Sequence, residues 1–343
     1  MTDTLVGIWQ RVLQVSAIGL EDNFFDLGGD SSLAVPLFSD IAQVFGRELP
    51  PVMIYHAPTI SALAAVLEQP TTSGFPPIVL LKAGAEEPPV FIAHGLGGSA
   101  MDFFQVVKHT EVRHPIYGMQ AKGIDGVDQP LQRIEDMAQF HLDGIKTLQP
   151  HGPYALIGYS LGGLVALEMA QQLSASGEKI SLLAMLDAYP YVGYLSPGQR
   201  VRLIAGQARR RASILVRLPM RDVLSYLSRL FDRGLRIFGD VSGSEPYRPP
   251  TGVSFNPAMR RVRDNAYLAL TRYQPRFYPG KIHFVRAAIG TDFPDDPVAV
   301  WGKLSAEIEV ETVPGDHLGI ITTHFERLAS TISRYVRGAF PEK

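Results

Sequence analysis

The sequence predicts an α/β protein in two parts, a small all-α bundle followed by a larger unit built on a mostly parallel sheet. Two observations lead to this prediction. Apolar residues recur at helical spacing through residues 1–68. From Ile78 onward, short apolar runs alternate with helical stretches instead. Residues 69–77 are rich in Pro, Thr, Ser and Gly, and they have the composition of a linker between the two parts.

The first part is expected to contain three helices. Residues 3–18, 31–46 and 60–67 each carry apolar side chains every three or four positions. The last of these stretches follows Pro58-Thr59, a typical way to begin a helix. Three helices of this length can enclose one small apolar core, so residues 1–68 are predicted to form a bundle.

Six apolar runs in residues 78–343 are the predicted strands: Val90–Ala93, Ile116–Met119, Tyr154–Ile157, Ile180–Leu186, Ile282–Arg286 and Ile308–Val313. Strands that alternate with helices in this way are typical of a parallel sheet covered by helices on both faces. The alternation stops between about residues 191 and 275, where the stretch 199–236 is helical in pattern and rich in arginine. An insertion of this length after a strand indicates a helical lid.

The composition narrows the possible functions. The chain has 343 residues, 46% of them apolar and 19% charged, with a formal net charge of −2, which does not point to nucleic acid. It has no cysteine, which excludes disulfides, thiolate catalysis and cysteine-bound zinc and favours a cytoplasmic location. We expect no metal site. No signal peptide is evident in Met1–Gln10, and no apolar run reaches the roughly 18 residues of a membrane span, so stable membrane insertion is not expected.

The pentapeptide Gly158-Tyr159-Ser160-Leu161-Gly162 has the form Gly-x-Ser-x-Gly and lies between a predicted strand and a predicted helix. A sharp strand-to-helix turn needs small residues on both sides of the serine, and it exposes the hydroxyl as a nucleophile. The helix dipole then favours negative charge beside it, and the Leu161 amide becomes a candidate oxyanion donor. This motif predicts the α/β-hydrolase fold with Ser160 as nucleophile.

A glycine-rich loop, His94-Gly95-Leu96-Gly97-Gly98, follows the strand Val90–Ala93. In the α/β-hydrolase fold a loop at this place supplies the second oxyanion amide, which we assign to Leu96. An alternative interpretation is a dinucleotide-binding fingerprint, because Gly95–Ala100 also fits its relaxed form. That fingerprint needs an acidic residue about 20 positions further on, and Ile116–Lys122 contains none.

A serine nucleophile needs a histidine base near the C-terminus in this fold. His317 follows the predicted strand Ile308–Val313 in the loop Val313–His317, and it is the predicted base. The other downstream histidines fit less well. His283 lies inside a predicted strand, and His324 lies inside the next predicted helix.

The acid that orients the histidine is predicted to be Asp187, directly after the strand Ile180–Leu186. Its carboxylate would lie at the same edge of the sheet as Ser160. The rivals are Asp292, Asp295 and Asp296, which follow the strand Ile282–Arg286. Asp316 is too close to the histidine in sequence to reach its imidazole easily.

The segment Asn23–Ala34, which reads Asn-Phe-Phe-Asp-Leu-Gly-Gly-Asp-Ser-Ser-Leu-Ala, resembles the attachment site of carrier proteins from nonribosomal peptide and polyketide synthases. Pro58–Ala64 resembles the last helix of the same domain, and residues 78–343 resemble the thioesterase that terminates such assembly lines. The resemblance implies 4′-phosphopantetheine covalently attached to Ser31, and it favours Asp187 as the acid. In many members of this family a larger apolar residue follows the modified serine, whereas in this chain the next residue is Ser32. If the motif is aligned one residue further along, the arm would be attached to Ser32 instead.

We therefore expect Ser160 to accept an acyl or peptidyl thioester from the carrier and to release it by hydrolysis or cyclisation. The expected partners are upstream synthase modules, a phosphopantetheinyl transferase and the acyl or peptidyl thioester substrate. Three alternatives stay open: transfer to a separate amine or alcohol, a non-catalytic carrier or docking module, and a nicotinamide-dependent reductase. The sequence identifies neither the acyl chain nor the mode of release. The chain is expected to be either the tail of a longer synthase or an enzyme that works in trans.

Overall fold

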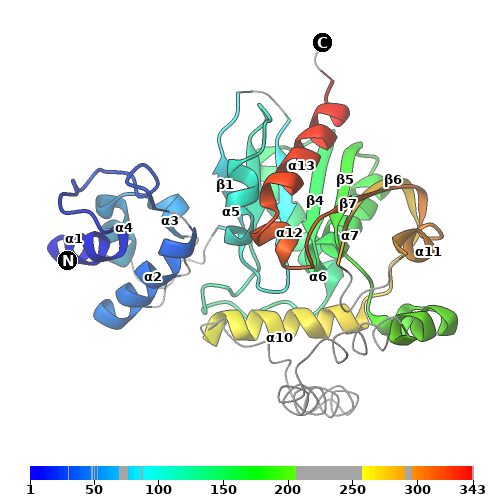
Figure 1. The fold of residues 1–343 in the computed structure, drawn as a ribbon, viewed down its shortest axis with the longest axis horizontal. Coiled ribbons are helices and arrows are strands. Elements are labelled where there is room, and N and C mark those ends of the chain that lie inside the picture. The colour runs from blue at the N-terminus through cyan, green and yellow to red at the C-terminus, as the bar shows by residue number, and fades with distance from the viewer. Residues whose placement is uncertain are drawn as a thin grey trace, which may run out of the picture.

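The structure is a computed structural model that describes residues 1–29, 31–47, 49, 51, 53–68, 76–85, 88–205, 257–289 and 296–341. Most of the predicted linker, the middle of the predicted lid and the rival acids Asp292 and Asp295 lie outside this description. Figure 1 shows a small helical bundle beside an α/β unit. The fold class predicted from the sequence is confirmed: a small helical region precedes a mostly parallel α/β sheet.

The bundle consists of four described helices: α1 (Thr2–Leu13), α2 (Ser31–Phe45), α3 (Met53–His56) and α4 (Ile60–Glu68). The first helix ends five residues before the predicted end, because Gln14 adopts a left-handed conformation with φ 58°. The short α3 was not predicted. Trp9 and Phe24 are fully buried in the bundle, and their rings meet edge to face with centroids 5.3 Å apart.

The α/β unit is built on one described sheet of seven strands in the order β1-β3-β2-β4-β5-β6-β7. Its strands are β1 (Ile78–Lys82), β2 (Val90–Ala93), β3 (Ile116–Met119), β4 (Tyr154–Tyr159), β5 (Ile180–Leu186), β6 (Tyr278–Ala287) and β7 (Ser305–Val313). The edge strand β1 runs antiparallel to β3, and every other described pair is parallel. The six predicted strands are present, several of them longer than predicted. The sequence pattern did not reveal β1.

Helices cover both faces of the sheet (Figure 1). The described helices of this unit are η1 (Ala100–Phe103), α5 (Phe104–Lys108), α6 (Ile134–Leu148), α7 (Leu161–Ala175), η2 (Val192–Tyr194), α10 (Pro257–Arg272), α11 (Pro297–Trp301), α12 (Gly319–Thr322) and α13 (Phe325–Ala339). One apolar core joins the sheet to α6 and α7, and a second joins its other face to α5 and α13.

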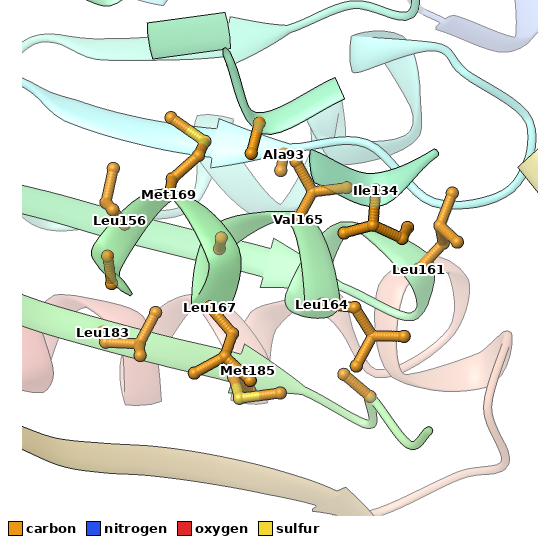
Figure 2. Close-up of a cluster of buried hydrophobic side chains, with 14 of the residues drawn as sticks. Ala93, Ile134, Leu156, Leu161, Leu164, Val165, Leu167, Met169, Leu183 and Met185 are labelled. Carbon is orange, nitrogen blue, oxygen red and sulfur yellow. The ribbon is translucent and has the colours of Figure 1, made fainter. Parts of the chain in front are cut away.

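The central helix α7 is anchored by apolar side chains on several of its sides. Figure 2 shows Leu164 and Leu167 on the side of α7 that faces β5, with Leu167 beside Met185, while Met169 and Val165 lie toward the side of β2. The four helical residues have no exposed surface. Each buried side chain of this size contributes roughly 1.5–3 kcal/mol, so the start of α7 is fixed firmly against the end of β4. In the described part of the chain, no helix is long and apolar enough to span a membrane.

Candidate active site

Ser160 lies in a strained turn between β4 and α7. Its φ is 55° and its ψ is −122°, a conformation that non-glycine residues rarely adopt. The turn is held by two backbone hydrogen bonds, from Ser160 N to Leu186 O (2.9 Å) and from Gly163 N to Ser160 O (3.0 Å). A Cβ at Gly158 would collide with the Gly162 carbonyl, so the small residues of the motif are a steric requirement.

Three residues from separate loops meet in one hydrogen-bonded relay. The Ser160 hydroxyl lies 3.0 Å from His317 Nε2, and His317 Nδ1 lies 2.8 Å from the Asp187 carboxylate. The carboxylate can only accept, so we assign the imidazole proton to Nδ1. Nε2 is then free to accept a proton from the serine hydroxyl. The structure thus brings together all three residues that the sequence placed in a triad.

Asp187 is held in place independently of the histidine. It is 4% exposed, and its φ of 47° turns the chain sharply at the end of β5. Its amide donates to Val285 O (2.7 Å), and its other carboxylate oxygen accepts from Ala287 N (3.1 Å). A carboxylate fixed by backbone groups in this way orients its partner without moving itself.

The described rival acids serve other elements. Asp296 accepts a hydrogen bond from Ala299 N (3.0 Å) and caps α11. Asp316 accepts from Gly319 N (2.7 Å) and closes the turn that carries His317. Neither carboxylate is directed at the imidazole by these bonds.

Tyr159 contributes to the site in a way that the sequence analysis missed. Its ring stacks on the His317 ring with centroids 4.8 Å apart and an interplanar angle of 21°. Its hydroxyl donates to the His317 backbone carbonyl at 2.8 Å. Burial, with a smaller contribution from nearby carboxylates, raises the pKa of the Tyr159 phenol above its ordinary value, so it remains a donor. The Gly-x-Ser-x-Gly motif allows any residue at this position, so the motif does not predict the contact between Tyr159 and His317.

The two predicted oxyanion residues follow the ends of two neighbouring parallel strands, β2 and β4. Ala93 at the end of β2 is paired with Gly158 on β4, so the loop carrying Leu96 emerges beside the turn that carries Ser160. Leu161 is the first residue of α7, where the amides have no partner within the helix. This placement agrees with the assignment of the two amides, which remains a prediction.

Two buried histidines, His94 and His141, pack against each other at the start of this loop. His94 Nδ1 is 2.7 Å from Gly95 O, and the His94 ring meets the His141 ring edge to face at 5.5 Å. Burial lowers the pKa of His94. Burial and the neighbouring His94 hold the pKa of His141 well below its ordinary value. Both rings are therefore neutral at pH 7. A small cavity of about 10 Å³ adjoins them, and Val262 of α10 forms part of its wall.

Ser31, the predicted attachment residue, is the first residue of α2. The first turn of α2 contains no acidic residue, and the helix dipole favours the negative charge of a phosphodiester at this end. The turn before it is tied by hydrogen bonds from Gly28 N to Phe25 O (3.1 Å) and from Gly29 N to Phe24 O (2.9 Å). These residues fit 4′-phosphopantetheine attached at the start of α2. Ser32 is the next residue of the same helix, so the choice between the two serines remains open.

The predicted lid, residues 191–275, is described only at its two ends. At one end, residues 197–205 are helical. At the other, α10 is tied to the sheet domain by Arg261 Nη2 donating to Gly126 O (3.0 Å) and Gln132 Nε2 donating to Asn265 Oδ1 (2.8 Å). Among the described residues, no group of three or more acidic, histidine or cysteine side chains is placed to bind a metal.

Two protein families match separate parts of the chain. Residues 3–67 match the phosphopantetheine attachment site family, and residues 88–223 match the thioesterase domain family. The first family indicates a covalently attached 4′-phosphopantetheine.

Curated relatives that match parts of this chain are much longer proteins. The dimodular nonribosomal peptide synthase of Bacillus subtilis is 40% identical over 189 residues, which is 55% of this chain and 8% of that protein. The malpibaldin synthetase of Mortierella alpina is 32% identical over 289 residues, which is 82% of this chain and 5% of that protein. The chain thus spans less than a tenth of either relative.

Solved structures share the fold. A holo four-domain nonribosomal peptide synthetase aligns over 98% of this chain and 26% of its own, with a TM-score of 0.58 and 22% identity. The Vlm2 thioesterase domain aligns over 77% of this chain and 98% of its own, with a TM-score of 0.51 and 20% identity. The chain therefore combines a phosphopantetheine attachment domain, matched at residues 3–67, with a thioesterase domain, matched at residues 88–223, and it is similar to nonribosomal peptide synthetases.

Proposed function

We propose that this chain is a serine thioesterase that takes an acyl or peptidyl group from its own carrier onto Ser160 and then releases it, ending nonribosomal peptide or polyketide biosynthesis. The observation that carries the proposal is the relay of Ser160, His317 and Asp187, with distances of 3.0 and 2.8 Å. The families matched at residues 3–67 and 88–223 supply the carrier and thioesterase context. We place the division between the two parts in residues 69–77.

Each residue of the relay has a defined role in the proposed reaction. His317 Nε2 accepts the Ser160 proton as the hydroxyl oxygen attacks the acyl carbonyl. Asp187 holds the imidazole in the correct tautomer and stabilises its positive charge. The amides of Leu96 and Leu161 stabilise the oxyanion, an interaction that typically contributes about 3–4 kcal/mol per donor. His317 then gives the proton to the departing thiolate of the thioester. The acyl group is now bound to Ser160 as an ester.

The phosphopantetheine supplies the thiol that the cysteine-free chain lacks, and it presents the acyl group as a thioester. The acyl-Ser160 ester is released by water, or by a hydroxyl or amine of the acyl chain itself. His317 acts as base a second time in either case. The partners that we propose are upstream synthase modules and a phosphopantetheinyl transferase. A cytoplasmic location remains a prediction.

The proposal is tested by fluorophosphonate labelling and by turnover of a soluble acyl thioester, such as an acyl N-acetylcysteamine. We expect wild type to be labelled and to turn over the thioester without nicotinamide, and Ser160→Ala to do neither. The variant Ser176→Ala, at an exposed serine after α7, is the matched control and should behave as wild type. Wild-type protein that is neither labelled nor active would favour a non-catalytic docking module. Strict dependence of release on an added amine or alcohol would favour acyl transfer.

A further inference from the structure

The helical bundle meets the thioesterase domain at an aromatic contact. Phe25, in the turn before α2, stacks on Phe104, the first residue of α5, with ring centroids 5.4 Å apart and an interplanar angle of 26°. On its other side Phe25 meets Phe24 edge to face at 5.5 Å, and Phe24 meets Trp9 in the same way at 5.3 Å. A continuous chain of aromatic rings therefore joins the core of the bundle to the surface of the thioesterase domain.

Apolar groups surround this aromatic contact. Val79 of β1 and Ala100 and Met101 of η1 are buried in the same cluster as the core of the bundle. The short helix α3 packs against β1, and Figure 1 shows the bundle lying beside this edge of the sheet. The ammonium group of Lys108 lies 5.9 Å from the centre of the Phe104 ring. Phe25 and Phe104 are themselves half-buried, and a packed aromatic pair bordered by buried apolar groups is a common form of interface hot spot.

The contact lies close in sequence to both chemical sites. Phe25 precedes Ser31 by six residues, and Phe104 follows Gly98, the end of the oxyanion loop, by six residues. Both connections are short. The first is closed by a hydrogen bond from Leu27 N to Asn23 O (3.1 Å), and the second by one from Met101 N to Ser99 Oγ (3.1 Å). The position of Phe25 on Phe104 therefore restricts where the start of α2 can lie relative to the oxyanion loop.

We propose that Phe104, Met101 and Val79 form the docking surface on which the chain's own carrier sits when it passes its acyl group to Ser160, with Phe25 as the anchor. This inference rests on the proposed function. The carrier and the thioesterase domain share one chain, so their effective concentration is high and a small contact is sufficient. Such a contact also lets the carrier leave for the upstream modules.

The first test is cross-linking in the apo protein, which has neither a native cysteine nor an arm thiol. The double variant Phe25→Cys/Phe104→Cys is treated with a short bis-maleimide and its mass is measured. We expect an intramolecular cross-link. The control pair Phe25→Cys/Phe277→Cys uses an exposed phenylalanine beside β6, five strands away from β1, and should not cross-link. Equal cross-linking of both pairs, no cross-linking of the first pair, or only intermolecular products would overturn docking within one chain.

The second test separates docking from chemistry. In the holo protein, Phe104→Ala should slow loss of the acyl group from the arm at least tenfold. Turnover of the soluble acyl thioester and labelling by fluorophosphonate should stay within twofold of wild type. Phe25→Ala should have the same pair of effects, and the exposed control Phe277→Ala should have neither. Wild-type protein that is inactive on the soluble thioester would contradict the proposed function. Unchanged transfer in Phe104→Ala, or equal losses on both substrates, would contradict the docking surface alone.

Discussion

The two serines assigned to acyl transfer differ in how the backbone holds them. Ser160 lies in a turn with φ 55°, between a buried strand and a buried helix, and a histidine lies 3.0 Å from its hydroxyl. Ser31 begins a helix, after a turn closed by ordinary backbone hydrogen bonds. A strained backbone costs on the order of 1–3 kcal/mol, and the burial around α7 maintains it.

This difference reflects the two kinds of chemistry proposed. Ser160 must react itself, so its base and oxyanion donors have to be fixed before the substrate arrives. Ser31 must be reached by a modifying enzyme and must then carry the arm to other sites, so it needs access and a favourable field. The proposal thus places a fixed nucleophile and a carrier attachment residue in one chain. The predictions below test each part of this comparison.

The largest effect is expected from Ser160→Ala. We expect release from the arm to fall at least about 10³-fold, because the covalent step is lost, while loading of the carrier is unchanged. Single-turnover kinetics measure release from the arm, and mass spectrometry measures loading of the carrier. If loading of the carrier fell together with release in Ser160→Ala, Ser31 and Ser160 would not have the separate roles that we assign to them.

Asp187→Asn should be next. The amide can donate to His317 Nδ1 and favour the wrong tautomer, so kcat should fall about 10³- to 10⁴-fold with little change in folding. Steady-state turnover of a soluble thioester measures this. The control Asp296→Asn alters only the α11 cap and should keep wild-type kcat. Equal losses in both variants would remove Asp187 from its assigned role.

Tyr159→Phe should have a smaller effect. The variant keeps the stacked ring but loses the hydrogen bond to the His317 carbonyl, an interaction worth about 0.5–1.5 kcal/mol. We expect kcat to fall roughly 2- to 12-fold, with KM unchanged. Tyr273→Phe, which loses a buried hydrogen bond to Glu168, is the control and should lower stability without changing kcat. An unchanged kcat in Tyr159→Phe would mean that the hydroxyl does not position the histidine.

The smallest effect concerns stability at low pH. The pKa values of His94 and His141 are lowered in the folded protein, so the unfolded chain binds protons first as the pH falls below about 6.5. The free energy of unfolding should therefore decrease below that pH by up to about 1.4 kcal/mol per histidine and pH unit. Urea unfolding at pH 7.5 and 5.5 measures the loss. His141→Gln should make this pH-dependent loss of stability smaller, whereas His151→Gln, at an exposed position, should leave it unchanged.

Much of the proposed site could be anticipated from the sequence because its chemistry dictates local patterns. The turn at Ser160 needs small neighbours, and the order of nucleophile, acid and base follows the order of the strands. The attachment-site motif Asn23–Ala34 in the bundle was equally local. The positions of Asp187 and His317 were inferred from the ends of predicted strands, and the structure places both beside Ser160.

The remaining features depend on contacts that no local pattern contains. The stacking of Tyr159 on His317 joins residues 158 positions apart, and the contact of Phe25 with Phe104 joins the two parts of the chain. The antiparallel strand β1 is recognised only by its pairing with β3. The early end of α1 results from the left-handed Gln14, which apolar spacing does not reveal.

The most direct test of the account is intact-protein and peptide mass spectrometry after incubation with a phosphopantetheinyl transferase and an acyl-CoA analogue. We expect the mass of an acyl-phosphopantetheine on Ser31 in both proteins. In wild type the acyl group alone passes to Ser160 and the phosphopantetheine stays on Ser31, whereas in Ser160→Ala the acyl group stays on the arm. The peptide map also distinguishes Ser31 from Ser32. Loss of the acyl group at the same rate in wild type and Ser160→Ala, with no acyl mass ever found on Ser160, would contradict it.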